Sequence, residues 1–340
     1  MRDPFPSSSR QDRFPGLGEK LVLTYANSTA TDGVGAQLQR IYGTYAIARL
    51  LGASYLHSPL SRVDYQGLGA LEHNRPDPAF HLDFNELLEI TSDVSPLDEF
   101  RELHLSKISL GTVLRLVERY ERNETNGRPW LVRLDAPYGI ADRYPDCYEA
   151  CKEISPFPSS VPGGRALRVA VHVRRGELFL VESDRMLPNS YYICIAQQIV
   201  EVLEALALDY HIELHTEVPT KAFFVQPGHH GIYDRIDAPV LLTPEMCRLE
   251  EFDVLPHLIP YVNGGAIDCL RRLATADILV MSKSSFSYLG GILNRNVVVL
   301  YHPFWHGAPS SWMTVGQDGH CDQLQLTRAV TTLLRRQAGG

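Results

Sequence analysis

The chain has 340 residues, of which 44% are hydrophobic and 21% are charged, a balance that excludes a disordered or fibrous protein and predicts a packed core. Its length suits two α/β domains of about 150 residues each. The formal net charge of −8, from 40 acidic and 32 basic residues, argues against nucleic acid as a partner, because binding a polyanion requires an extended basic surface.

The first 19 residues are polar and rich in proline and serine, and we expect residues 1–19 to be a disordered N-terminus. They contain no apolar signal segment, and no later stretch reaches the about 18 apolar residues of a membrane-spanning helix. We therefore expect a soluble chain with no membrane span. These absences favour a cytoplasmic over a lumenal location and leave the compartment open.

An N-terminal α/β domain is predicted over residues 20–154. The short apolar and β-branched run at 21–25 predicts a buried strand. Apolar residues then recur at helical spacing from 36 to 51, and residues 53–57 form a second strand-like run. Strand, glycine-bearing loop, helix and strand together predict a βαβ opening.

Further along the chain, the sequence predicts helical pieces at 85–90 and 112–121 and a strand at 129–134. Prolines, serines and glycines between 155 and 165 predict an exposed linker. The second domain is predicted over 166–330. Its strands are expected at 167–173, 210–215, 239–242, 277–281 and 297–301, and its helices at 190–207, 264–276 and 285–293. This alternation predicts a largely parallel, doubly wound sheet.

The strand predicted at 167–173 ends in a polar cluster of His172, Arg174, Arg175 and Glu177. Ligands of open α/β sheets bind at this end of the strands. A guanidinium group pairs with phosphate oxygens in a forked geometry and keeps its proton. Because side chains alternate along a strand, only one of the two arginines is expected to touch phosphate directly. In the plainer alternative, the arginines solvate the strand end and one of them pairs with Glu177.

A second polar segment follows the strand predicted at 277–281. Ser284, Ser285 and Phe286 begin the next helix, where hydroxyls and unpaired backbone N–H groups can meet an anion. A simple serine cap of the helix is the alternative interpretation. On the preceding predicted helix, Asp268 is either a carboxylate that contacts the ligand or a solvated surface residue.

A glycine-bearing loop with Asp32, Gly33, Gly35 and Gln37 lies between the first strand and the first helix. It does not predict a dinucleotide fold, because Gly33-x-Gly35 lacks a third glycine three residues later. Asp32 and Gln37 are expected to face the interdomain cleft on the acceptor side. An ordinary helix-capping role for Asp32 stays open.

No metal site is predicted. The six cysteines lack the paired C-x-x-C spacing of a zinc site, and no Asp-x-Asp triplet occurs. Arginines and helix N-termini can replace a divalent ion in stabilising a diphosphate.

The three polar segments resemble motifs of fucosyltransferases. His-x-Arg-Arg-Gly-Glu at 172–177 is similar to the His-x-Arg-Arg-Gly-Asp segment of α1,2-fucosyltransferases and the His-Val-Arg-Arg segment of α1,6-fucosyltransferases. Residues 276–290 are similar to the C-terminal motif of the same enzymes. Residues 32–39 resemble the Gly-Asn-Gln loop of protein O-fucosyltransferases and the related α1,2 loop, except that Ala36 replaces the asparagine.

The resemblance implies a GT-B-like fold, in which two Rossmann-like domains face a cleft and the C-terminal half binds the nucleotide. It implies that His172 contacts the guanine or ribose and that Arg174 or Arg175 contacts the phosphates. Asp268 lies one residue away from the position of a guanine-reading aspartate of the α1,6 family. The remaining residues expected to contact the donor are Ser284, Ser285, Phe286, Gly33, Gly35 and Gln37.

The resemblance also implies a metal-independent, inverting glycosyltransferase that transfers fucose from GDP-fucose to a hydroxyl of a glycan or protein. Glu177 or Asp32 would accept the acceptor proton, while Arg174, Arg175 and the serine turn stabilise the departing GDP. No cofactor is expected besides the donor substrate. The alternatives are transfer of another sugar, such as xylose, rhamnose or arabinose, and a non-catalytic carbohydrate- or nucleotide-binding protein.

Overall fold

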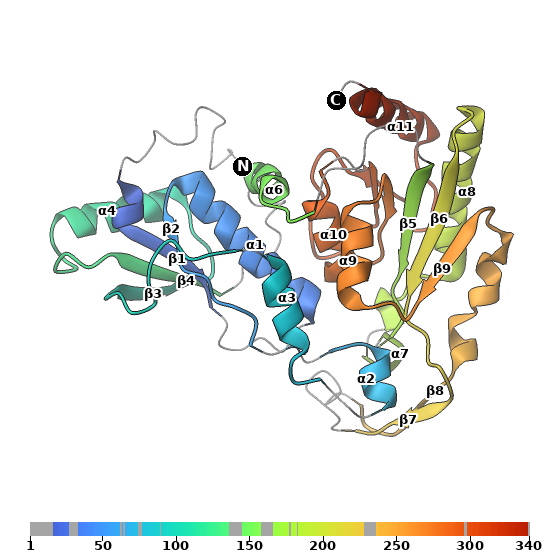
Figure 1. Ribbon diagram of the computed structural model, residues 1–340, viewed down its shortest axis with the longest axis horizontal. Coiled ribbons are helices and arrows are strands. Elements are labelled where there is room, and N and C mark those ends of the chain that lie inside the picture. The colour runs from blue at the N-terminus through green and yellow to red at the C-terminus, as the bar shows by residue number, and fades with distance from the viewer. Residues whose placement is uncertain are drawn as a thin grey trace. The chain divides into compact units, whose positions relative to one another are not determined.

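A computed structural model describes residues 16–26, 33–61, 63, 65–73, 77–88, 90–135, 145–157, 166–176, 178–181, 183–227, 236–295 and 298–338. The chain divides into two compact units. The first unit comprises Met1–Ala30, Ala36–Arg62 and His81–Pro156, and the second comprises Thr31–Gly35, Val63–Phe80 and Phe157–Gly340. Both are α/β structures with a parallel main sheet (Figure 1).

The first unit contains a four-stranded parallel sheet in the order β2-β1-β4-β3. All five residues of β1 are buried. Its strands are β1 (Leu21–Tyr25), β2 (Ser54–Tyr55), β3 (Arg101–Leu105) and β4 (Trp130–Leu134). Its helices are η1 (Leu17–Glu19), α1 (Val34–Leu51), α3 (Phe80–Leu88), α4 (Leu110–Glu121) and α6 (Pro145–Glu153). The predicted βαβ opening is therefore present as β1, α1 and β2.

Three predictions for this unit differ from the structure. Residues 16–19 are not part of a loose N-terminus, because η1 anchors them through Leu17, which is 1% exposed. The helix predicted at 85–90 begins earlier, as α3 at Phe80. Strand β3 was not predicted.

The second unit is built on a six-stranded parallel sheet in the order β12-β11-β10-β5-β6-β9. Its strands are β5 (Leu167–Val173), β6 (Tyr210–Thr216), β9 (Leu258–Val262), β10 (Ile278–Val280), β11 (Val298–Tyr301) and β12 (Met313–Thr314). Helices α9 (Ala266–Ala274) and α10 (Ser285–Leu293) lie on one side of this sheet, and α8 (Asn189–Ala205) lies on the other (Figure 1). The predicted doubly wound, parallel α/β sheet is confirmed.

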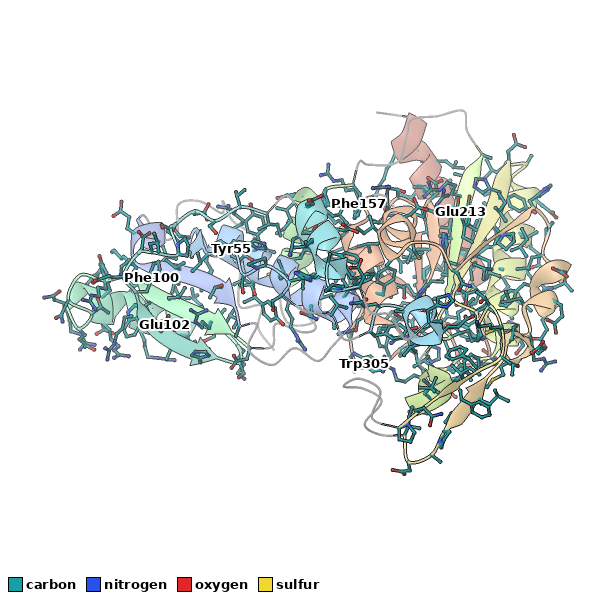
Figure 2. The ribbon with its side chains drawn as sticks, turned by 60° about the horizontal axis from the view of Figure 1, so that its bottom comes forward. Tyr55, Phe100, Glu102, Phe157, Glu213 and Trp305 are labelled. Carbon is teal, nitrogen blue, oxygen red and sulfur yellow. The ribbon has the colours of Figure 1, made fainter. Side chains whose placement is uncertain are left out.

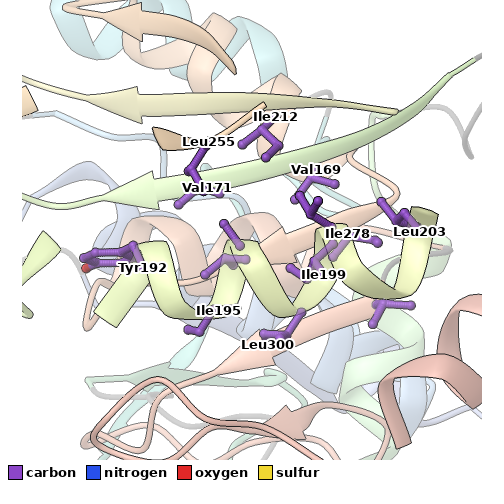
Figure 3. Close-up of a cluster of buried hydrophobic side chains, with 14 of the residues drawn as sticks. Val169, Val171, Tyr192, Ile195, Ile199, Leu203, Ile212, Leu255, Ile278 and Leu300 are labelled. Carbon is purple, nitrogen blue, oxygen red and sulfur yellow. The ribbon is translucent and has the colours of Figure 1, made fainter. Parts of the chain in front are cut away.

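The main core of the second unit lies between the sheet and α8. Val169 and Val171 of β5 pack with Ile195 and Ile199 of α8 (Figure 3). Helix α11 (Gln323–Ala338) contributes Leu326 to the same core. Because β5 is covered on both faces, its central residues Val169–Val171 are apolar and buried, as is typical of a central parallel strand.

A smaller layer accompanies this sheet. Strands β7 (Phe223–Val225) and β8 (Val240–Leu242) form an antiparallel hairpin, against which Leu68 of α2 (Leu68–Glu72) packs. The remaining elements are α7 (Leu178–Val181), η2 (Ser183–Arg185), η4 (Pro244–Cys247) and η5 (Leu249–Val254). Burial of Leu68 with Val225 and Leu242 explains why segment 63–80 belongs to this unit, and not to the N-terminal domain predicted over 20–154.

The second unit resumes at Phe157, inside the connection predicted at 155–165. No helix within the described ranges is both long and apolar enough to cross a membrane.

Candidate functional site

Polar side chains gather where the central strands of the second sheet end. Strand β5 lies between β10 and β6, with Val171 opposite Val280 and Val173 opposite Thr216. All these strands are parallel, so their carboxyl ends meet at one edge of the sheet. This edge is where open α/β sheets bind ligands.

His172 occupies the penultimate position of β5 and is 9% exposed. Its Nδ1 lies 2.9 Å from the Ser282 hydroxyl, and its ring lies 5.9 Å from that of Phe286. Burial lowers the pKa of His172 to about 3, and the charges of His215 and Arg174 act in the same direction. The imidazole is therefore neutral at physiological pH, with its second ring nitrogen able to donate or accept one hydrogen bond.

Arg174 reaches the N-terminus of α10. Ser284 is the N-cap of this nine-residue helix, and its hydroxyl accepts a hydrogen bond from the Phe286 backbone N–H at 3.2 Å. Arg174 Nη1 donates to the same hydroxyl at 3.3 Å. A permanent cation thus stands at the positive end of a helix dipole, and both favour an anion at this point.

Arg175 points to the other side of the sheet, as strand alternation requires. It is 5% exposed and donates to the side chain of Asn189 at the start of α8. Asn189 in turn donates to the backbone carbonyls of Cys247 and Arg248, each at 3.0 Å. Burial lowers the pKa of Arg175, yet an arginine keeps its charge in any protein environment. These contacts place Arg175 at the start of α8, on the other side of the sheet from α10.

The Ser285 side chain contacts a histidine side chain, His306. Its hydroxyl lies 3.0 Å from Nε2 of His306, and Trp305 Nε1 donates to the same nitrogen at 3.1 Å. Because the indole can only donate, Nε2 accepts and the proton of the neutral ring resides on Nδ1. Burial, followed by the charge of Arg185, lowers the pKa of His306 to about 4. Trp305 is 52% exposed.

Asp268 belongs to an ion-pair network instead of the strand-end cluster. It pairs with Arg272 at 2.8 Å and with Arg271 at 3.8 Å, both on its own helix. Arg272 also lies 3.3 Å from Glu213, a carboxylate of β6 that is only 2% exposed (Figure 2).

The glycine-bearing loop is divided between the units. Gly33 and Gly35 are grouped with the second unit, while Gln37 is fully buried on α1 in the first. A Cβ atom at Gly35 would lie 2.5 Å from the Cα of Phe286, so only glycine fits there. The structure therefore brings Gly35 to the start of α10. Asp32 and Glu177, the two expected bases, lie outside the described residues.

Two residues of this edge were missed in the sequence analysis. Glu217 directly follows β6, and the Tyr65 hydroxyl donates to its Oε2 at 2.5 Å. A carboxylate placed just after a predicted parallel strand was a usable signal for Glu217. No local pattern connects Tyr65, 152 residues away in the sequence, with this site. Within the part of the chain that the structure describes, no group of three His, Cys, Asp or Glu residues is arranged to hold a metal ion.

No protein-family model matches the chain. No curated protein matches it either. Solved structures to which the chain is similar include Escherichia coli ADP-heptose lps heptosyltransferase II, at 11% identity and a TM-score of 0.37, covering 94% of this chain and 99% of that one.

Two further solved structures to which the chain is similar are complexes with GDP. Arabidopsis thaliana FUT1 aligns at 12% identity and a TM-score of 0.37, over 84% of this chain and 71% of that one. POFUT1 aligns at 12% identity and a TM-score of 0.34, over 81% and 95% of the two chains.

Proposed function

We propose that the chain is a glycosyltransferase that binds the diphosphate of a nucleotide sugar where β5 meets the N-terminus of α10. The observation that carries this proposal is the hydrogen bond from Arg174 to the N-cap hydroxyl of Ser284. The guanidinium and the first backbone N–H groups of α10 supply positive charge and hydrogen-bond donors at one point. A departing diphosphate needs both, because positive charge and hydrogen-bond donors stabilise its negative charge.

In the transfer step, the acceptor hydroxyl oxygen attacks the anomeric carbon of the sugar from the face opposite the diphosphate. The bond between this carbon and the phosphate oxygen breaks, and its electron pair remains on the oxygen. The positive charge of Arg174 and the α10 dipole stabilise the negative charge that develops there. A carboxylate, Glu177 or Asp32, takes the acceptor proton.

For the donor we propose GDP-fucose, on the likeness of residues 172–177 and 276–290 to fucosyltransferase motifs. The neutral imidazole of His172, fixed by Ser282, suits a hydrogen bond to the nucleoside. A xylosyl, rhamnosyl or arabinosyl donor would use the same diphosphate contacts. A non-catalytic protein that binds nucleotides or carbohydrates is the alternative from another class.

Thermal unfolding with and without nucleotides tests the binding site. We expect GDP to raise the unfolding midpoint more than GMP, because only GDP places a second phosphate at α10, and ligand binding stabilises the fold by mass action. Comparison with ADP and UDP identifies the base. Arg174→Ala should abolish the difference between GDP and GMP, whereas Arg271→Ala, a surface arginine of α9, should leave it unchanged.

Hydrolysis of GDP-fucose without acceptor distinguishes an enzyme from a binding protein. We expect slow release of free fucose that persists in EDTA, because arginine and helix dipole replace a metal ion. Loss of turnover in EDTA with recovery in Mn²⁺ would contradict metal independence. Equal midpoints with and without every nucleotide diphosphate would contradict the proposed site itself.

A further inference from the structure

Trp305 is a large aromatic residue that stays half exposed near the proposed diphosphate site. It follows β11, which ends at Tyr301, and it is 52% exposed. The other two tryptophans of the chain, Trp130 and Trp312, are 3% and 4% exposed. An indole normally buries most of its surface. A half-exposed indole next to a binding site is therefore a candidate for contact with the ligand.

The segment that carries Trp305 is firmly held. The neighbouring His306 is 1% exposed, and its ring stacks on that of Tyr288 of α10, with centroids 4.6 Å apart. The Tyr288 hydroxyl donates to the Gly307 backbone carbonyl at 2.6 Å, and the Tyr301 hydroxyl donates to the His306 carbonyl. The exposed indole thus projects from a fixed frame, and a fixed frame reduces the entropy that binding costs.

The indole lies beside the first residue of α10. Its Nε1–H donates to Nε2 of His306 at 3.1 Å, and the Ser285 hydroxyl lies 3.0 Å from the same nitrogen. Ser285 directly follows Ser284, the N-cap whose hydroxyl accepts a hydrogen bond from Arg174. Trp305 and Arg174 are therefore connected to adjacent serines at the start of one helix. A diphosphate held there brings the group attached to it close to the indole.

A guanidinium group packs on the same indole. The central carbon of the Arg185 guanidinium lies 4.2 Å from the centre of the Trp305 ring, which is within the range of a cation–π interaction. Arg185 ends η2, and this element is itself tied to the start of α10, because Lys283 Nζ donates to the Asp184 backbone carbonyl at 3.3 Å. An apolar ring and a cation with N–H donors thus lie together at this point.

We propose that Trp305 and Arg185 form the surface against which the sugar of the nucleotide sugar packs. This inference rests on the proposed function, because it takes the diphosphate at the start of α10 as given. A sugar ring carries apolar C–H groups and hydroxyls, which suit the indole and the guanidinium respectively. The sugar is joined directly to the outer phosphate. The nucleoside is proposed to meet His172, which leaves Trp305 for the sugar.

Substitutions at Trp305 test the contact by calorimetric titration of GDP and GDP-fucose. Trp305→Phe keeps an aromatic ring and loses the indole N–H, whereas Trp305→Leu keeps only apolar volume. We expect Trp305→Leu to weaken GDP-fucose binding about tenfold and GDP binding less than about twofold, and Trp305→Phe to retain most of the affinity. The control is Phe224→Leu, which removes an aromatic ring of β7 that is 61% exposed and should match the wild type.

Acrylamide quenching of tryptophan fluorescence measures the exposure of Trp305 directly. Because Trp130 and Trp312 are buried, collisional quenching arises mainly from Trp305, and Trp305→Phe should remove it. We expect GDP-fucose to lower the quenching constant of the wild type several-fold, because the sugar covers the indole. GDP alone should leave the constant near that of the free protein.

The outcomes distinguish this inference from the proposed function. If GDP and GDP-fucose both bind and neither changes the quenching, the sugar lies elsewhere, and the inference is overturned while the diphosphate site stands. Full protection by GDP alone would overturn it too, because the base would then cover the indole. Equal losses of GDP and GDP-fucose affinity in Trp305→Leu would reduce Trp305 to a support of α10. If neither ligand binds the wild type, the proposed donor fails and the sugar surface fails with it.

Discussion

Adjacent arginines at the end of β5 have different surroundings and therefore different expected roles. Arg174 is partly exposed and contacts the N-cap of α10, whereas Arg175 is 5% exposed and contacts Asn189. The sequence motif alone makes the two equivalent. Strand alternation separates them, and the helix that covers each face decides which cation is available to a ligand.

Replacing each arginine by alanine should give opposite results. Arg174→Ala should lower kcat/KM at least 10²-fold, about 2.7 kcal/mol of transition-state stabilisation, with little change in the unfolding midpoint. Arg175→Ala should lower stability by about 1–3 kcal/mol, because Asn189 loses a buried hydrogen-bond partner. Steady-state kinetics and urea unfolding of both variants measure this difference. Near wild-type kinetics for Arg174→Ala would refute its assignment to the phosphates.

At the scale of secondary structure, the N-cap of α10 is Ser284, whose hydroxyl accepts hydrogen bonds from the Phe286 backbone N–H and from Arg174. Ser109 caps α4 in the first unit in the ordinary way: its hydroxyl accepts from the Thr112 backbone N–H at 3.2 Å and lies 2.9 Å from the Thr112 hydroxyl, with no cation bound to it among the contacts that the structure gives. Ser284→Ala and Ser109→Ala should each lower the free energy of unfolding by about 0.5–2 kcal/mol, because each removes a helix cap. Only Ser284→Ala should also weaken GDP binding, because it removes a contact of Arg174.

Calorimetric titration of GDP into both variants measures this contrast. Ser284→Thr keeps a capping hydroxyl and should retain most of the affinity. If Ser109→Ala weakened GDP binding as much as Ser284→Ala, loss of stability would account for the effect and α10 would have no special role.

Elements with strong local patterns could be predicted from the sequence, and the others depend on tertiary contacts. The predicted bounds of β5 and α10 agree with the structure. Strands β3 and β9 were missed because both are edge strands whose residues are largely exposed, and β9 contains Pro260. Edge strands lack the continuous apolar run of a buried parallel strand.

The same division applies to the site. His172 and Arg174 could be predicted as candidates from the sequence because a core strand rarely ends in such residues. Asp268 was predicted from its place one residue away from an aspartate of the family that the sequence resembles, yet its charge is paired with Arg272. Tyr65 could not be found, because its hydrogen bond to Glu217 accompanies the packing of Leu68 against a hairpin more than 150 residues further along the chain.

At the scale of the whole molecule, one buried carboxylate connects the layers of the second unit. Glu213 on β6 lies 3.3 Å from His215 and from Arg272, and 3.8 Å from Arg168 of β5. Burial alone would raise the pKa of Glu213, but the His215 hydrogen bond and the charge of Arg168 outweigh it and lower the pKa to about 2. Its ionised form therefore favours the folded state.

The resulting acid sensitivity has a definite sign. An unfolded glutamate has a pKa of about 4.3, so the contribution of Glu213 is present above this pH and is lost as pH falls toward 2. Glu213→Gln should destabilise the protein by about 1–3 kcal/mol at pH 7, because it removes the buried carboxylate charge that pairs with the half-buried side chains of Arg168 and Arg272. It should also lose less further stability between pH 5 and pH 3 than the wild type.

Urea midpoints at these pH values measure both effects. The control is Glu124→Gln, which removes an exposed pair with Arg119 and should change little, since surface pairs contribute little. A Glu213→Gln variant as stable as the wild type at pH 7 would show that the network is not required for the fold.

The discontinuous second unit also has a consequence for synthesis of the chain. Tyr65 and Glu217 are 152 residues apart, and Leu68 is covered by a hairpin that is made equally late. At translation rates of about 5–20 residues per second, segment 65–72 waits on the order of ten seconds for its partners. During this interval the whole of 81–156 is synthesised, and the apolar side chains of segment 65–72 have no hairpin to pack against. The nascent chain therefore exposes an apolar surface that chaperones can bind.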